Sequence, residues 1–310
     1  MPYKLIRGRS FAQEAGRLLD QEIIDATTGL THASAVDSLR LLHATRKHLK
    51  KARALLTMAR RPLGDRYFQA DDELRTANRA LGPLVDAHRV LETIAAARRE
   101  GVVKLPATTF AALRLRLDAQ AKTLEQAAIV DHVRPRIVRL LKSLRLELAT
   151  AGLAGLDRAT IVAEIREAHA VTRKARRRAI KRPSVAAFHQ WRRRLKREWH
   201  LFRLVAEVTG DRLLDERHQL AALDDCLGAL HDVDVLIGAL AVDRRLSRIE
   251  LARVLVALRA HRHGLRRLAH RLSSVLDERP QQLARRVLML WGSAPRQRAV
   301  AMVPAWPRSA

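Results

Sequence analysis

Apolar residues recur at spacings of three and four along nearly the whole chain, which is the period of an amphipathic α-helix. Glycine and proline, with 13 and 10 copies in 310 residues, fall mainly between segments of helical length. Breaks are expected at residues 29–34, 62–65, 82–83, 101–106, 152–157, 183–184, 210–211 and 280. The pattern therefore predicts an all-α fold of antiparallel helices joined by short connections.

An internal repeat organises the chain. A constant offset of 182 − 36 = 146 residues aligns residues 36–91 with 182–237 without a gap. The matched pairs include His43/His189, Arg46/Arg192, Leu49/Leu195, Lys50/Lys196, Gly64/Gly210, Asp65/Asp211, Arg66/Arg212, Leu81/Leu227, Gly82/Gly228, Leu84/Leu230 and Asp86/Asp232. We therefore expect one domain over residues 1–310, built from homologous halves at 1–150 and 151–291 and followed by a tail at 292–310.

The first basic helix is expected from about Ala33 to Arg61. At 100° per residue, its basic positions fall within about 80° of one another. The stripe contains His43, Arg46, Lys50 and Arg53, and Arg40 and Lys47 widen it. A core-facing side is expected from Leu41, Leu42, Thr45, Leu49, Ala52 and Leu56.

The second half repeats this arrangement in a helix expected from Ser184 to about Thr209. One broad face is expected to hold His189, Arg192, Arg193, Lys196, Arg197, His200 and Arg203. Trp199 stands where the first half has Arg53, and a further basic segment over residues 173–181 precedes the helix. Like charges on one face repel each other, so the arrangement favours a bound anion. Because histidine titrates near neutral pH, His43 and His189 are expected to strengthen phosphate binding as the pH falls.

The charge balance also predicts a polyanionic partner. Lys and Arg number 59 against 32 Asp and Glu, which gives a formal net charge of +27. Cys226 is the single cysteine, so no intramolecular disulfide or cysteine zinc cluster can form. No uncharged run is long enough to span a membrane, and residues 1–7 lack a secretory core. We expect a cytoplasmic protein without membrane insertion.

Three other functions compete with polyanion binding as explanations of the basic helices. A non-specific nucleic-acid binder would use the same cations, but aromatics are only 4% of the chain and none interleaves the first basic helix, so only weak binding through phosphates is expected. An anionic membrane surface would need an apolar face that the bundle core uses more simply.

An enzyme is the third alternative, with the pairs Asp224–Asp225 or Asp232–Asp234 holding Mg²⁺. Aspartates at such places more often cap helices or pair with arginine, and His261 and His263 point to different helix faces. No phosphate loop, zinc-protease motif or nucleophile elbow is present. We expect no catalysis, no metal and no cofactor, and assign Asp86 and Asp232 to orienting basic side chains.

The duplicated His-x-x-Arg-x-x-x-Lys motif, each copy followed by Leu-Gly-x-Leu-x-Asp (Leu81–Asp86; Leu227–Asp232), resembles the CHAD family, the conserved histidine α-helical domains. The resemblance runs from about Ser10 to Leu290. It implies two four-helix bundles related by pseudo-two-fold symmetry, with the two basic helices lining a central groove for inorganic polyphosphate. It also implies association with polyphosphate granules in the bacterial cytoplasm.

On this resemblance, the polyphosphate-binding residues are His43, Arg46, Lys50, Arg53, His189, Arg192, Arg193, Lys196 and Arg197, followed by Arg40, Lys47 and Arg203. The chain departs from the family in having Trp199 at a usually basic position. It also has Val85-Asp86-Ala87-His88 where Arg-Asp-x-Asp is typical, while residues 231–234 (His-Asp-Val-Asp) stay closer. The Glu-x-Glu-x-Lys strand of the CYTH triphosphatase domain, often fused to this family, is absent, so a standalone protein is expected.

Overall fold

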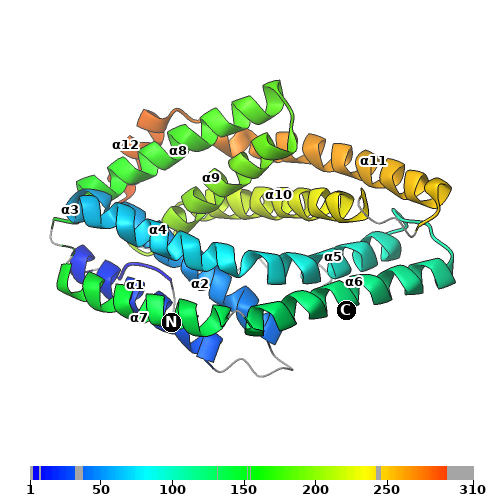
Figure 1. Cartoon of the computed structure of the whole chain (residues 1–310). Coiled ribbons are helices and arrows are strands. Elements are labelled where there is room, and N and C mark those ends of the chain that lie inside the picture. Colours follow the sequence, from blue (N-terminus) through cyan, green and yellow to red (C-terminus); the bar gives the residue numbers. More distant parts are fainter. Residues whose placement is uncertain are drawn as a thin grey trace.

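A computed structural model describes residues 3–291 apart from 7, 32–37, 131, 152, 154 and 242–245, so the expected tail lies outside the described residues. It confirms the all-α fold, since the described residues form helices and no strand (Figure 1). The first seven helices are α1 (Phe11–Thr31), α2 (Ser38–Met58), α3 (Arg60–Leu63), α4 (Asp65–Ala80), α5 (Gly82–Arg99), α6 (Ala107–Val130) and α7 (Val133–Ala151). They are followed by α8 (Arg158–Lys181), α9 (Val185–Leu204), α10 (Leu214–Ala241), α11 (Arg248–Leu272), the 3₁₀ turn η1 (Ser273–Leu276) and α12 (Pro280–Leu290).

The helices pack in a matching order along the chain. The pairs α1–α2, α2–α4 and α1–α7 contact each other in the first half, and α8–α9, α9–α10 and α8–α12 do so in the second. Helices α4 and α5 lie end to end along one line, and the single long helix α10 takes the corresponding place in the second half (Figure 1). Helix α6 covers the far end of α5, and α11 covers the far end of α10. The packing agrees with two similar halves, and their origin in a duplication stays a prediction.

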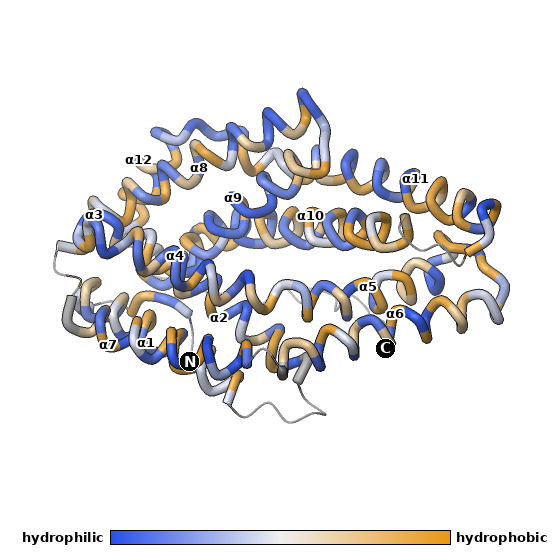
Figure 2. Tube along the Cα trace, in the orientation of Figure 1, coloured by the Kyte–Doolittle hydropathy of each residue, from blue (hydrophilic) through white to orange (hydrophobic). Residues whose placement is uncertain are grey.

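Two clusters of buried apolar side chains hold the helices together. The larger one joins α1–α5, α7–α10, the C-terminal end of α11 and α12, and so crosses from one half to the other. The smaller one joins the distal ends of α5 and α10 to α6 and α11. In the described residues, no helix combines the length and apolar character needed to cross a membrane. The shared core fixes α2 and α9 relative to each other, and with them their polar faces, which are prominent on α9 in Figure 2.

The ends of the two basic helices differ from those expected. Residues 33–37 lie outside the described part, and α2 stops at Met58, with a separate short helix α3 following. Helix α9 is capped by the Ser184 hydroxyl, which accepts from the Ala187 amide at 3.1 Å. It ends at Leu204, five residues before Thr209, and the Leu5 amide donates to the Leu204 carbonyl at 2.8 Å. The N-terminal segment thus satisfies a carbonyl at the end of α9.

Two glycines paired by the repeat share an unusual backbone conformation. Gly64 has φ +54° and Gly210 has φ +60°, each in the turn that follows a basic helix. Side chains with a Cβ rarely adopt this left-handed region, whereas glycine does so readily. The conformational requirement explains why glycine stands at both positions.

Candidate anion-binding site

Helix α2 separates core and charge as its sequence predicts. The side chains of Leu42, Thr45, Leu49, Ala52 and Leu56 are fully buried, and the basic stripe lies on the other side. Of the predicted site residues on α2, His43, Arg46, Lys50 and Arg53 are half-buried, and Arg40 and Lys47 are exposed. Most of the first basic stripe is therefore partly withdrawn from water rather than freely solvated.

Helix α9 carries the second set, with one error in the prediction. His189, Arg192, Lys196, Arg197 and Arg203 are half-buried, and Arg193 is exposed.

His200, expected on the same face, is only 1% exposed, with an edge-on ring contact to Tyr3 and a tilted one to Trp199. Neither ring nitrogen has a hydrogen-bond partner among the described residues. Burial, then repulsion from Lys196 and Arg203, holds the pKa of His200 well below its usual range. The residue is neutral and covered by the N-terminal segment, so its placement on the open basic face was wrong.

The basic faces of α2 and α9 meet at Lys50 and Arg192. Burial lowers the pKa of Lys50 to about 7, and repulsion from Arg46, Arg192, Lys196 and Arg89 adds to the effect. Burial likewise lowers the pKa of Arg192. Within the part of the chain that the structure describes, neither side chain has an ion pair or a hydrogen bond. We call Arg46, Lys50, Arg89, Arg192 and Lys196 the central cation cluster.

Carboxylates hold the cations around this pair. Asp86 on α5 accepts from Arg46 at 3.3 Å, and Asp232 on α10 accepts from Arg89 at 2.6 Å. These contacts confirm that Asp86 and Asp232 orient basic side chains. Lys196 contacts Asp224 of α10, also a carboxylate of the second half.

The flanking cations are held in the same way. Arg53 forms two hydrogen bonds with Asp71 of α4, at 2.8 and 3.0 Å, and Arg197 donates to Glu164 of α8 at 3.2 Å. Both arginines are therefore pre-oriented by ion pairs before any ligand arrives.

The repeat is broken at its two aspartates. Arg46 and Arg192 are paired positions, as are Asp86 and Asp232, so symmetry would have Asp232 accept from Arg192. Instead Asp232 accepts from Arg89, which lies in the other half. Arg192 is left without a carboxylate within ion-pair distance among the described residues.

The guanidinium of Arg192 packs over Gly228 of α10. A Cβ built on Gly228 would lie 3.8 Å from Nη2 and 3.9 Å from Nε of Arg192, so the guanidinium lies directly over the bare backbone of α10. The paired glycine, Gly82, has no such neighbour. The paired glycines thus have different surroundings, and the repeat alone does not locate Arg192 against α10.

The histidines of the site are kept neutral. Burial lowers the pKa of both His43 and His189, with repulsion from Arg89 and Arg193 as the next cause, respectively. The His231 ring lies 4.9 Å from that of His189, and burial lowers its pKa to about 4. At neutral pH these rings offer hydrogen-bonding nitrogens rather than positive charge. His231 was not among the predicted site residues, although the motif at 231–234 marks its position.

Trp199 keeps two cations close although it replaces a basic residue. The ammonium of Lys196 lies 4.5 Å from the Trp199 ring, and the guanidinium of Arg203 lies 4.8 Å from it. Arg203 also lies 5.4 Å from the ring of Tyr3. These cation–π contacts hold cationic side chains at the edge of α9.

Further arginines were missed because they lie outside the two basic helices. Arg75 and Arg79 of α4 lie near enough to contribute to lowering the pKa of Arg193, although burial is its main cause. Arg89 of α5 acts in the same way on Lys50. Their sequence context is an ordinary polar helix face, and only the packing of α4 and α5 against α2 and α10 brings them here.

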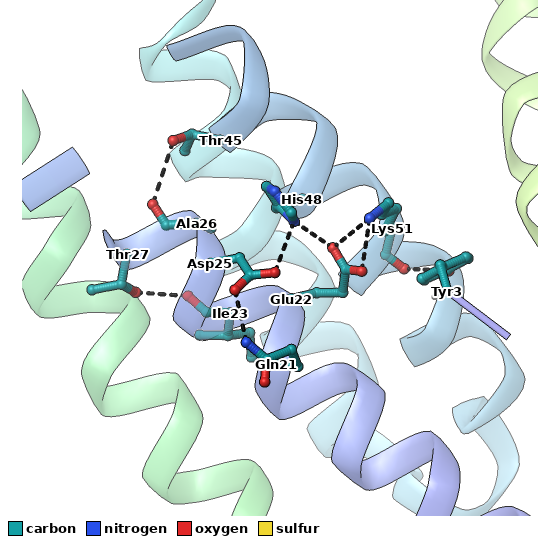
Figure 3. Close-up of polar contacts among 10 residues, drawn as sticks. All are labelled: Tyr3, Gln21, Glu22, Ile23, Asp25, Ala26, Thr27, Thr45, His48 and Lys51. Carbon is teal, nitrogen blue, oxygen red and sulfur yellow. Dashed lines mark hydrogen bonds and ion pairs between the residues drawn. The ribbon is translucent and has the colours of Figure 1, made fainter. Parts of the chain in front are cut away.

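One group in the described residues has metal-ligand character, and it lies between α1 and α2 (Figure 3). His48 Nδ1 lies 2.6 Å from Glu22 and 3.6 Å from Asp25. The Lys51 ammonium also donates to both oxygens of Glu22, at 2.8 and 3.1 Å. A lysine already occupies the carboxylate that a metal would need, so the group is best explained as an ion-paired network that joins the two helices.

Comparison with known proteins identifies the family of the chain. The family model described as CHAD domain matches residues 27–241, which include α2 and α9 and end with α10. None of the curated proteins matches the chain significantly. Helices α11 and α12 lie beyond the match but pack against the same two cores. CHAD domains are linked as a family to polyphosphate binding, and nothing in the match indicates a CYTH domain. On the length of this match, the chain belongs to the CHAD domain family.

Proposed function

We propose that the protein binds inorganic polyphosphate in a groove between α2 and α9, through the central cation cluster and its flanking histidines. The observation that carries the proposal is the pair Lys50 and Arg192, two half-buried cations that face each other without a carboxylate partner among the described residues. Holding such charges together costs free energy in the empty protein. A bound anion would offset that cost.

The chemistry of the cluster fits a phosphate chain. Arginine supplies forked, charge-assisted hydrogen bonds, and lysine acts as a point charge. Neutral His43 and His189 can donate one hydrogen bond each to phosphate oxygens. Because the cations come from α2, α5 and α9, a linear polyanion can engage several at once, and binding should strengthen with chain length.

We further propose that the protein binds polyphosphate without chemical turnover. Three of the four aspartates that could have held Mg²⁺ are engaged by cations: Asp224 by Lys196, Asp232 by Arg89 and Asp234 by Arg262. Asp232 and Asp234 also face different helices, α5 and α11. This arrangement favours electrostatic support of the arginines over metal chelation. Binding to long polymer would place the protein on polyphosphate granules.

Charge reversal tests the site. Arg46→Glu combined with Arg192→Glu should weaken binding of long-chain polyphosphate by more than about tenfold, a loss of at least 1.4 kcal/mol. The matched control is Arg259→Glu with Arg267→Glu, which changes the net charge equally at two exposed positions on α11. Circular dichroism checks that both variants keep their helices. Equal weakening by the two double variants would show that only net charge matters and would refute the groove.

A further inference from the structure

Arg89 is a cation of the site that does not belong to either basic helix. It lies on α5, and its Nη1 donates to Asp232 Oδ2 of α10 at 2.6 Å. The side chain of Arg89 is 35% exposed and that of Asp232 is 16% exposed. The ion pair therefore joins the two halves and leaves part of the guanidinium open to solvent.

Arg89 lies among the two unpaired members of the central cation cluster, Lys50 and Arg192, and two neighbouring histidines. Burial is the main cause of the lowered pKa of His43 and Lys50 of α2, of Arg192 of α9 and of His231 of α10, and repulsion from Arg89 contributes to each. These groups come from three helices, and Arg89 adds a fourth. An anion that contacts Lys50 and Arg192 would therefore lie close to Arg89 as well.

Asp232 fixes Arg89 without using up its donors. A guanidinium has five N–H groups, and the bond to Asp232 Oδ2 uses one of them. The other carboxylate oxygen, Oδ1, is buried without a hydrogen-bond partner in the described part of the chain. This leaves the remaining N–H groups of Arg89 available for a ligand.

Arg89 has no counterpart in the second half. The residue that matches Arg89 at the 146-residue offset is Val235, which cannot bind an anion. Since Asp232 accepts from Arg89 rather than from Arg192, one carboxylate orients the first arginine and leaves the second unpaired. The site is therefore asymmetric, although the helices that form it are paired.

We propose that Arg89 binds phosphate directly in the central cation cluster, in an orientation set by Asp232. The proposal rests on the proposed function. Arg89 would contact the phosphate units that also contact Lys50 and Arg192, so that α5 contributes to the site together with α2 and α9.

The test is the salt dependence of long-chain polyphosphate binding to the full chain. Each cation that contacts a phosphate releases condensed counterions, so its loss makes the negative slope of log K against log salt less steep by roughly one. Arg89→Gln should lower the affinity roughly tenfold and reduce the magnitude of the slope by about one. Arg99→Gln is the matched control, because Arg99 is exposed on the same helix about 15 Å further along. It should leave the slope unchanged.

Asp232→Asn separates direct binding from support of the fold. This variant breaks the same ion pair but keeps the charge of Arg89, so it should keep the wild-type slope. An unchanged slope in Arg89→Gln, or equal slope losses in Arg89→Gln and Asp232→Asn, would overturn the proposal. Both outcomes presuppose that the wild-type protein binds polyphosphate. Failure of the wild type to bind would instead refute the proposed function.

Discussion

Lys50 of α2 lies near Arg192 of α9, and neither side chain forms an ion pair with a carboxylate among the described residues, although Asp224 and Asp232 attract Arg192 from a longer distance. Burial and the neighbouring cations bring the pKa of Lys50 to about 7. A bound polyanion would restore the charged form, because an anion close to an ammonium raises its pKa. Ligand binding and protonation of Lys50 are thereby linked.

Binding should therefore take up protons at pH 8, where Lys50 is largely neutral in the free protein. We expect uptake approaching one proton per site at pH 8 and much less at pH 6, where Lys50 is already charged. The affinity should fall as the pH rises through 7. Titration calorimetry in two buffers of different ionisation enthalpy measures the uptake.

Lys50→Arg is the control for this linkage, because its guanidinium stays charged throughout the range. The variant should bind without proton uptake from Lys50 and with a flatter pH dependence. Proton uptake as large in Lys50→Arg as in the wild type would show that another group takes up the proton.

His169 and Glu198 should make stability depend on pH. His169 Nδ1 lies 2.6 Å from Glu198 Oε1 and its Nε2 lies 2.9 Å from the Glu278 carbonyl oxygen, so both partners are acceptors and the ring is doubly protonated. Burial lowers the pKa of His169, but the bond to Glu198 and its charge outweigh this and raise it overall. The His169–Glu198 pair thus contributes its full stabilisation of the fold below the unfolded pKa of histidine, about 6.5. That contribution is lost as the pH rises through the higher pKa that His169 has in the folded protein.

His169→Gln should cost about 3 kcal/mol of unfolding free energy at pH 6, because it leaves the buried Glu198 carboxylate without its cation. The cost should shrink at alkaline pH. Denaturant unfolding at pH 6 and pH 9 measures it, and Glu198→Gln added to His169→Gln should recover part of the loss. A cost that does not change with pH would contradict a charged His169.

Gly228 should tolerate a small side chain and no larger one. A Cβ at this position meets Arg192 at 3.8 Å, which is ordinary contact, and alanine favours a helix interior by up to about 1 kcal/mol over glycine. Gly228→Ala should therefore keep or raise the melting temperature and retain polyphosphate binding. Gly228→Leu should displace Arg192 and weaken binding while the chain remains helical.

The two Gly228 variants are compared by circular dichroism and by polyphosphate titration. Equal affinities for Gly228→Ala and Gly228→Leu would show that the position of Arg192 over α10 is unimportant for binding.

The helix faces could be predicted from sequence because they depend on local periodicity. Leu42 and Leu49 are buried, Lys50 lies on the basic side, and α9 begins next to Ser184, all as the sequence pattern predicts. The role of Asp86 was also predicted correctly, since its pairing with Arg46 joins helices of the same half.

Long-range contacts account for the differences. The sequence of α9 places His200 in the middle of its basic face, but Tyr3 and the segment after it, nearly 200 positions earlier, cover it. Asp232 takes Arg89 as its partner because α5 packs against α10, a contact that no local pattern specifies. The neutral state of His43 depends on burial, which periodicity alone could not predict.

The central claim is that α2 and α9 form a shaped site for polyphosphate rather than a generic basic surface. Its most direct test is a titration of the protein with long-chain polyphosphate and with single-stranded and duplex DNA, at about 0.15 M salt and then at higher salt, where exposed charges are increasingly screened. We predict a preference for polyphosphate that persists as salt is raised. Equal binding of all three polymers that collapses together with salt would contradict the claim and favour non-specific nucleic-acid binding through the same surface.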